Sequence, residues 1–158
     1  MKDDRNTITI YTDGSCYGNQ NEVNYGGWGA VLLYKEHKKT IYDGEKNTTN
    51  NRMEMTAVIK ALESLKRNDL KIRLHTDSAY ISNCINQKWY IKWRKNNWKN
   101  SKKQDVENKD LWVRLLDLYE SFDDIEFIKV KGHDGVELNE LADDLANKGS
   151  KKAECLDM

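Results

Sequence analysis

Alternating hydrophobic and polar positions predict two strands with nearly the same pattern. Residues 7–12 and 70–76 both alternate as half-buried strands do. Each run ends on Thr-Asp, at Asp13 and at Asp77, and the Gly-Ser pair that follows Asp13 predicts a turn. The repetition indicates that the two strands serve one site.

The same patterns predict three more strands and five helices. The strands are expected over residues 25–36, 39–45 and 125–130, the first two forming a hairpin with a turn near residue 37, and the helices over residues 50–68, 78–86, 88–95, 110–120 and 136–148. Asn50 or Asn51 is the expected N-cap of the first helix.

Antiparallel strands followed by strands that alternate with helices favour an α/β fold. We expect a five-stranded mixed sheet, with three antiparallel then two parallel strands, and flanking helices. At 158 residues the chain fits one domain. We place that domain over residues 1–150 and expect a frayed C-terminal tail over residues 151–158.

Net charge, the length of apolar runs and the cysteine content bear on the partners and the compartment expected for the chain. The chain has 26 basic and 26 acidic residues, so net charge gives no argument for a polyanionic partner. No apolar run approaches the ~18 residues of a membrane span. Cys16, Cys84 and Cys155 are odd in number and widely spaced, which is typical of free thiols in a reducing cytoplasm.

Asp13 and Asp77 meet if their strands are neighbours, parallel and in register. Ile10 then pairs with Leu74, and the two aspartates lie on the same face of strands about 4.8 Å apart. Two carboxylates that close are unfavourable unless one is protonated or a cation lies between them. The alternative is that Asp77 caps the following helix and Asp13 belongs to a turn.

Other polar residues are expected near the same place. The apolar stripe of the helix over residues 50–68 continues onto Glu54, so Glu54 faces inward towards a cation or only complements the helix dipole. Asp143 and Asp144 flank opposite edges of the last helix's apolar stripe, and the helical pattern does not choose between them. His133 lies in a glycine-flanked loop, from which it reaches the site or is merely solvated.

Carboxylates that converge without Cys or His ligands favour hard cations such as Mg²⁺ or Mn²⁺. Two such ions about 3.5–4 Å apart form the clamp used for in-line phosphodiester displacement. Calcium binding is a competing use of carboxylates, but the chain has no EF-hand sequence.

Residues 87–104, called the basic segment below, indicate a nucleic-acid surface. The basic segment carries seven Lys or Arg residues, no acidic residue, and three of the five tryptophans. Cations interleaved with stacking side chains suit a phosphate backbone and its bases. The alternative is that the tryptophans pack the segment onto the domain and the lysines are only solvated; both roles are compatible.

As a set, the motifs resemble type 1 ribonuclease H. They are TDGSC, TTNNRMEM, TDSAYI and KGH followed by ELNELADDLA, and with the basic segment they occur in order over residues 7–149. The resemblance implies a ribonuclease H-like fold and an endonuclease that hydrolyses the RNA strand of RNA–DNA hybrids. It implies two Mg²⁺ ions during catalysis, with Mn²⁺ as a substitute, and products with 5′-phosphate and 3′-hydroxyl ends. We expect a monomer.

The resemblance also assigns residues to roles. The metal ligands are Asp13, Glu54, Asp77 and Asp143, the alignment favouring Asp143 over Asp144, and His133 aids proton transfer or product release. The implied hybrid contacts are Asn19, Thr49, Asn50 and Asn51, and, in the basic segment, Lys88, Trp89, Lys92, Trp93, Arg94, Lys95, Trp98 and Lys99. Ala79 stands where the family often has Gln, which removes one polar contact to the substrate.

Three other functions compete with this one. A sister DNA nuclease or integrase-type enzyme on the same fold keeps the carboxylates but has no need of 2′-hydroxyls. A catalytically silent module binds the hybrid without cutting it, although all four carboxylates and His133 are present. A metal-binding domain without a nucleic-acid partner leaves the basic segment unexplained.

Overall fold

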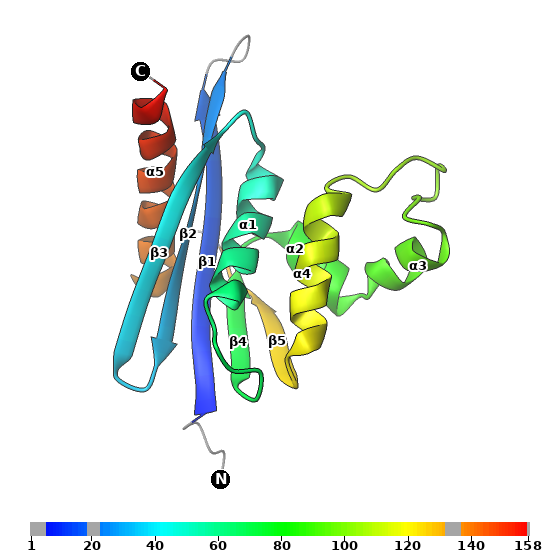
Figure 1. The fold of residues 1–158 in the computed structure, drawn as a ribbon, viewed down its shortest axis with the longest axis horizontal. Helices are drawn as coiled ribbons and strands as arrows, with labels where there is room; N and C mark the ends of the chain where they lie inside the picture. Colours follow the sequence, from blue (N-terminus) through cyan, green and yellow to red (C-terminus); the bar gives the residue numbers. More distant parts are fainter. Residues whose placement is uncertain (1–5, 19–22, 132–136, 158) are drawn as a thin grey trace.

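A mixed five-stranded sheet runs through the middle of the protein (Figure 1). The computed structural model describes residues 6–18, 23–131 and 137–157. The strands are β1 (Thr7–Gly18), β2 (Asn24–Tyr34), β3 (His37–Lys46), β4 (Lys71–Thr76) and β5 (Asp124–Lys129). Their order is β3-β2-β1-β4-β5. The first three are antiparallel, and β4 and β5 are added in parallel, which confirms the predicted fold class.

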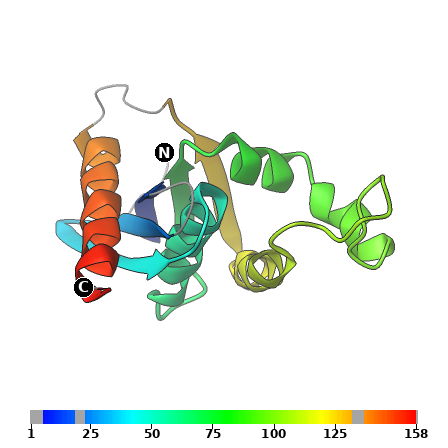
Figure 2. The same ribbon diagram turned by 90° about the horizontal axis from the view of Figure 1, so that it is seen from above.

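Helices cover both faces of the sheet. They are α1 (Asn50–Glu63), α2 (Ala79–Asn86), α3 (Trp89–Lys95), α4 (Lys109–Ser121) and α5 (Glu137–Leu156). Helix α5 lies alone on one face, and α1 lies on the other with α4 beside it (Figures 1 and 2). Because β2 is covered from both sides, residues 26–32 are all buried.

The predicted alignment of the two Thr-Asp strands is confirmed. Strands β1 and β4 are parallel neighbours, with Ile8 opposite Ile72 and Ile10 opposite Leu74. These apolar residues are buried in the main core with α1. The hydroxyl of Thr12 donates a 3.5 Å hydrogen bond to the carbonyl oxygen of His75, which ties the strands together beside the carboxylates.

Strand β1 is longer than predicted. The expected turn at Gly14-Ser15 is wrong, because β1 continues to Gly18 and pairs with β2 up to Asn24. Asp13 therefore lies inside a strand, opposite Gly29, whereas Asp77 follows the last residue of β4.

The ends of α1 also differ from the prediction. Thr49, not Asn50 or Asn51, is the N-cap, and its hydroxyl accepts a hydrogen bond from the backbone N–H of Arg52. The helix ends at Glu63 rather than at residue 68. At its C-cap, the hydroxyl of Ser64 donates to the carbonyl oxygen of Ala61.

The C-terminal residues are more ordered than predicted, since α5 continues through Leu156. Glycines allow this helix to lie close to the sheet: a Cβ atom on Gly149 would lie 2.0 Å from the carbonyl oxygen of Asp43. Beyond the helix, the carboxylate of Asp157 accepts hydrogen bonds from Tyr25 (2.7 Å) and Lys46 (2.8 Å). The expected frayed tail is therefore replaced by a docked last turn.

Two further observations bear on the setting of the protein. Within the described ranges, no helix is both long and apolar enough to cross a bilayer. The three cysteines are free thiols, of which Cys84 is buried and Cys155 exposed.

Candidate active site

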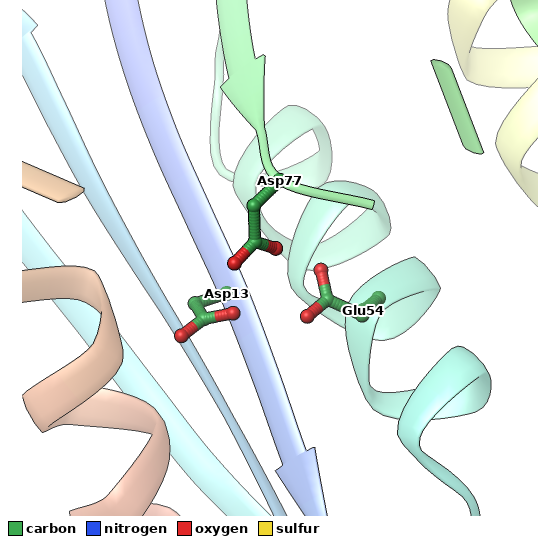
Figure 3. Close-up of side chains that lie close together, drawn as sticks. All are labelled: Asp13, Glu54 and Asp77. Carbon is green, nitrogen blue, oxygen red and sulfur yellow. The ribbon is translucent and has the colours of Figure 1, made fainter. Parts of the chain in front are cut away.

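Three carboxylates from three different elements converge beside the end of β4. Figure 3 shows Asp13 from β1, Glu54 from α1 and Asp77 just after β4 pointing towards one another. One carboxylate oxygen of each lies within 4.8 Å of the others. Asp13 and Glu54 are buried and Asp77 is half-buried. The pairing of the two aspartates, inferred from their repeated sequence, is therefore present.

The alternative role of Asp77 as a helix cap is not the one observed. Ser78 occupies the N-cap of α2, and its hydroxyl accepts a 3.1 Å hydrogen bond from the backbone N–H of Ile81. Asp77 is thus left to face Asp13 and Glu54.

Gly14 brings α1 against β1 at the site. Its backbone N–H donates a 3.0 Å hydrogen bond to Oε1 of Glu54. A Cβ atom at this position would lie 2.4 Å from the backbone nitrogen of Glu54 and 2.5 Å from the carbonyl carbon of Met53. Only glycine lets the helix approach closely enough for Glu54 to reach Asp13. The sequence pattern missed this role because Gly-Ser suggested a turn.

Crowding changes the proton affinity of the cluster. Burial raises the pKa of Asp13 from 3.8 to about 7, and the charge of Asp77 acts in the same direction. Burial also raises the pKa of Glu54 well above its ordinary value, and the charge of Asp13 adds to this effect. Like charges in a poorly solvated site favour protonation unless a cation compensates them.

The donor set fits a hard divalent cation. Oε2 of Glu54 is buried and has no hydrogen-bond partner among the described residues, a costly state for a carboxylate oxygen. Among the residues that the structure describes, the neighbouring donors in the group are carboxylate oxygens of Asp13 and Asp77, with no sulfur or imidazole. Oxygen-only donors are those that Mg²⁺ and Mn²⁺ prefer. An ion here would satisfy the orphaned oxygen and offset the repulsion.

The last helix carries a fourth acidic residue, Asp143, which is half-buried and lies outside the group of three converging carboxylates. Its side chain contributes to the raised pKa of Asp13. Asp144 is exposed. The structure thus distinguishes two residues that the helical pattern alone could not separate.

A cleft of about 500 Å³ opens beside the carboxylates. Its lining includes Glu54 and Asp77 together with Asn50 and Asn51 from the first turn of α1 and Tyr80 from α2. Asn50 and Asn51 are exposed, as expected of residues that contact a substrate. Tyr80 was not among the predicted site residues, although it lies within the TDSAYI motif.

The basic segment stands away from the sheet, with α3 and the following loop at the far side of α4 (Figures 1 and 2). Two of its tryptophans anchor it: Trp93 and Trp98 are half-buried against the core, and the rings of Trp93 and Trp112 are 5.6 Å apart. Trp89 is more exposed, at 36 %. The packing interpretation is therefore confirmed for Trp93 and Trp98, and the contact of the segment with nucleic acid stays a prediction.

The cations of the basic segment fall into two groups. Arg94 forms a bidentate pair with Glu120, and Lys99 pairs with Asp105. The exposed lysines that form no ion pair with other described residues are Lys88, Lys92, Lys95, Lys102 and Lys103. These five lysines are the cations most available to phosphates.

Two predicted site residues lie outside the described residues. They are Asn19, between β1 and β2 in the sequence, and His133, between β5 and α5 in the sequence. Their assigned roles stay predictions.

Comparisons with known proteins agree with this geometry. The sequence matches the family described as RNase H over residues 5–151. It is 49% identical over 152 residues to a Ribonuclease H of Caldanaerobacter subterraneus subsp. tengcongensis, covering 96% of each chain.

Solved structures show the same likeness. The crystal structure of a type 1 RNase H with the type 2 active-site motif superposes with a TM-score of 0.81 at 28% identity, covering 96% of this chain and 75% of the other. A foamy viral protease-reverse transcriptase in complex with RNA/DNA hybrid matches with a TM-score of 0.79 at 25% identity, covering 92% of this chain and 20% of the other.

Proposed function

This chain belongs to the RNase H family and is an endoribonuclease, and we propose that it cuts the RNA strand of RNA–DNA hybrids at the Asp13–Glu54–Asp77 cluster. The observation that carries the proposal is the convergence of three carboxylates, one with an orphaned buried oxygen, at the edge of an open cleft. Asp143 is proposed as the fourth ligand, supported by its half-buried place on α5 and by its contribution to the raised pKa of Asp13.

The proposed cofactor is Mg²⁺, two ions during catalysis, with Mn²⁺ as a substitute. Asp13, Glu54, Asp77 and Asp143 would hold the metal. When bound, it would supply an activated water and stabilise the charge that develops on the leaving oxygen. The oxygen-only donor set supports this choice.

The residues of the chain itself orient the substrate and hold protons. Asp13 and Glu54, whose pKa values are raised, exchange protons for metal when the site is loaded. The water loses a proton as its oxygen forms the new bond to phosphorus, the bond from phosphorus to the 3′ oxygen breaks, and that 3′ oxygen takes up a proton to become the hydroxyl. The products carry 5′-phosphate and 3′-hydroxyl ends. His133 is proposed to aid proton transfer or product release.

Hybrid recognition is proposed to use two surfaces. Asn50 and Asn51 in the cleft, with Thr49 and Asn19, face the minor groove, where the RNA strand displays its 2′-hydroxyls. The basic segment grips the DNA strand through phosphate contacts. Exposed lysines and the outward Trp89 support the second surface.

The monomeric state and the cytoplasmic setting are also proposals. Three free thiols support a reducing compartment.

The test is cleavage of a hybrid labelled on its RNA strand, with Mg²⁺ and with EDTA, next to RNA–RNA and DNA–DNA duplexes. We expect cleavage of the hybrid alone, lost in EDTA and in Asp13→Asn. Cleavage of DNA–DNA would favour a DNA nuclease on the same fold. Tight hybrid binding without cleavage would indicate a silent binding module and overturn the proposal.

A further inference from the structure

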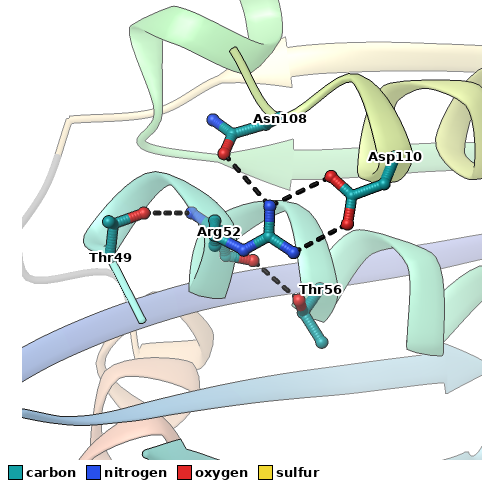
Figure 4. A network of polar contacts seen from close by, with 5 residues as sticks. All are labelled: Thr49, Arg52, Thr56, Asn108 and Asp110. Atoms are coloured by element: carbon teal, nitrogen blue, oxygen red, sulfur yellow. Dashed lines mark hydrogen bonds and ion pairs between the residues drawn. The ribbon is translucent and has the colours of Figure 1, made fainter. Parts of the chain in front are cut away.

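Arg52 lies two residues before Glu54 on α1, and its side chain reaches the start of α4 (Figure 4). The guanidinium donates two hydrogen bonds to the carboxylate of Asp110, at 3.1 Å and 2.8 Å. It donates a third, at 3.3 Å, to the side-chain oxygen of Asn108. Because the guanidinium group is planar, three hydrogen bonds fix its orientation as well as its position.

The backbone of α1 at Arg52 is fixed as well. Its N–H donates to the hydroxyl of Thr49, and its carbonyl oxygen accepts a 2.7 Å hydrogen bond from the hydroxyl of Thr56. Arg52 is therefore a rigid point of the helix that carries Glu54, Asn50 and Asn51.

Asn108 and Asp110 lie where the chain enters α4 shortly after the basic segment. Asn108 occupies the N-cap of α4 in the left-handed region, with φ of 60°, and its side chain makes no capping hydrogen bond. Asparagine usually caps the helix in this position. Here its side-chain oxygen accepts from Arg52 instead, so a local capping bond is replaced by a contact 56 residues away in sequence.

We propose that Arg52 is a positioning residue that fixes the distance between the catalytic helix α1 and the basic segment, so that one hybrid contacts both. This inference rests on the proposed function. The connection matters because the basic segment projects from the body of the protein (Figure 2). Arg52 fixes the start of α4, where the chain comes back to the body after the basic segment. A hybrid seated on the carboxylates meets the lysines of the basic segment only if that spacing is kept.

A second ion pair joins the same two helices and provides a matched control. Arg114 of α4 donates a 2.9 Å hydrogen bond to Glu63 at the other end of α1. Both pairs are substantially exposed, and such pairs add little stability. If Arg52 only docks α4 on α1, removing either pair will have the same small effect.

The experiment compares Arg52→Met, Asp110→Asn and the double variant with Arg114→Met. Binding of a fluorescent hybrid is measured in an Asp13→Asn background with Mg²⁺, using one hybrid long enough to reach the basic segment and one too short to do so. KM and kcat are measured in the otherwise unchanged protein, and the melting temperature shows that each variant is folded.

For the long hybrid, we expect Arg52→Met and Asp110→Asn each to weaken binding and raise KM roughly tenfold, with kcat changed by less than about threefold. The double variant should match Arg52→Met, since Arg52→Met alone already removes the pair with Asp110 as well as the hydrogen bond to Asn108. Binding of the short hybrid and the behaviour of Arg114→Met should be unchanged.

Equal effects on both hybrids, or in Arg52→Met and Arg114→Met alike, would overturn the positioning role. So would unchanged long-hybrid binding in folded Arg52→Met and Asp110→Asn. These results differ from the result that would contradict the proposed function itself. In that case the wild-type protein would not cleave the hybrid at all.

Discussion

Asp13, inside β1, and Asp77, just after β4, occupy equivalent positions, two residues beyond the pairing of Tyr11 with His75. One oxygen of each lies within 4.8 Å of the other. In the metal-free protein, burial and, to a lesser degree, the charge of Asp77 oppose ionisation and raise the pKa of Asp13 to about 7. The same geometry that suits a cation therefore makes the metal-free site less stable at neutral pH.

The first prediction concerns stability against pH without metal. A carboxyl whose pKa is raised by folding contributes stability below its unfolded pKa, near 3.8, and loses it as pH rises towards 7. Asp13→Asn removes this titration. At pH 8 in EDTA, we expect it to raise the free energy of unfolding by about 1–3 kcal/mol.

Urea unfolding at pH 5 and pH 8 measures this difference. Asp144→Asn, which changes an exposed carboxylate on α5, serves as the control and should leave the wild-type pH dependence intact. Parallel stability curves for wild type and Asp13→Asn would contradict the raised pKa.

The second prediction concerns the metal. A ligand that binds only the folded state stabilises it by about 2.7 kcal/mol at 100 times its dissociation constant. Because Mg²⁺ competes with protons for Asp13 and Glu54, we expect the rise in melting temperature on adding Mg²⁺ to be larger at pH 8 than at pH 5. Asp13→Asn should lose most of that rise. A Mg²⁺ effect that is independent of pH would argue that the ion binds elsewhere.

The third prediction separates two adjacent aspartates of α5. Asp143 is half-buried and contributes to the raised pKa of Asp13, whereas Asp144 is exposed. We expect Asp143→Asn to lower kcat by at least about tenfold at limiting Mg²⁺, since loss of a metal ligand or its support weakens the site. Asp144→Asn should keep wild-type activity. Equal losses in the two variants would indicate a general charge effect.

The alignment of Asp13 with Asp77 could be predicted because the alternation of residues along a strand determines which face of the sheet each side chain occupies. Side chains alternate with a period of two, so two runs with the same alternation and the same terminal Thr-Asp have one register that buries both apolar sets. The inward direction of Glu54 followed from helical periodicity in the same way. These parts of the site depend on short-range patterns.

Other parts of the site could not be predicted from local patterns. Position 14 requires glycine because the backbone of α1 passes within contact of it, a constraint that arises only after the helix packs. The contact between Arg52 and Asp110 joins residues 58 positions apart. The docked end of α5 depends on Lys46 and Tyr25, which lie more than a hundred residues away from Asp157.

The fourth prediction tests the close approach at Gly14. In Gly14→Ala the new methyl group would lie 2.4 Å from the backbone nitrogen of Glu54, and backbone atoms on both sides cannot move aside cheaply. We expect a loss of about 2 kcal/mol or more in the free energy of unfolding, and at least a tenfold loss of kcat as Glu54 moves from Asp13. Ser15→Ala, on the neighbouring half-buried residue, is the control. Near-normal kcat in Gly14→Ala would mean that Glu54 need not touch β1.

The fifth prediction concerns the basic segment. The logarithm of the hybrid binding constant should fall linearly with the logarithm of salt concentration, and each lost phosphate contact should reduce the slope by roughly one. Lys92→Ala with Lys95→Ala should therefore flatten the slope by about two. These lysines form no ion pair with other described residues, whereas Arg94 and Lys99 pair with Glu120 and Asp105.

Arg94→Ala with Lys99→Ala is the matched comparison within the same segment. Because Glu120 and Asp105 already neutralise these two cations in part, removing them should change the slope less than removing Lys92 and Lys95. The cleavage rate at saturating hybrid should stay near wild type in both pairs, since the carboxylates are untouched. An unchanged slope in the Lys92 and Lys95 variant would show that the hybrid does not contact α3, whatever the activity of the site.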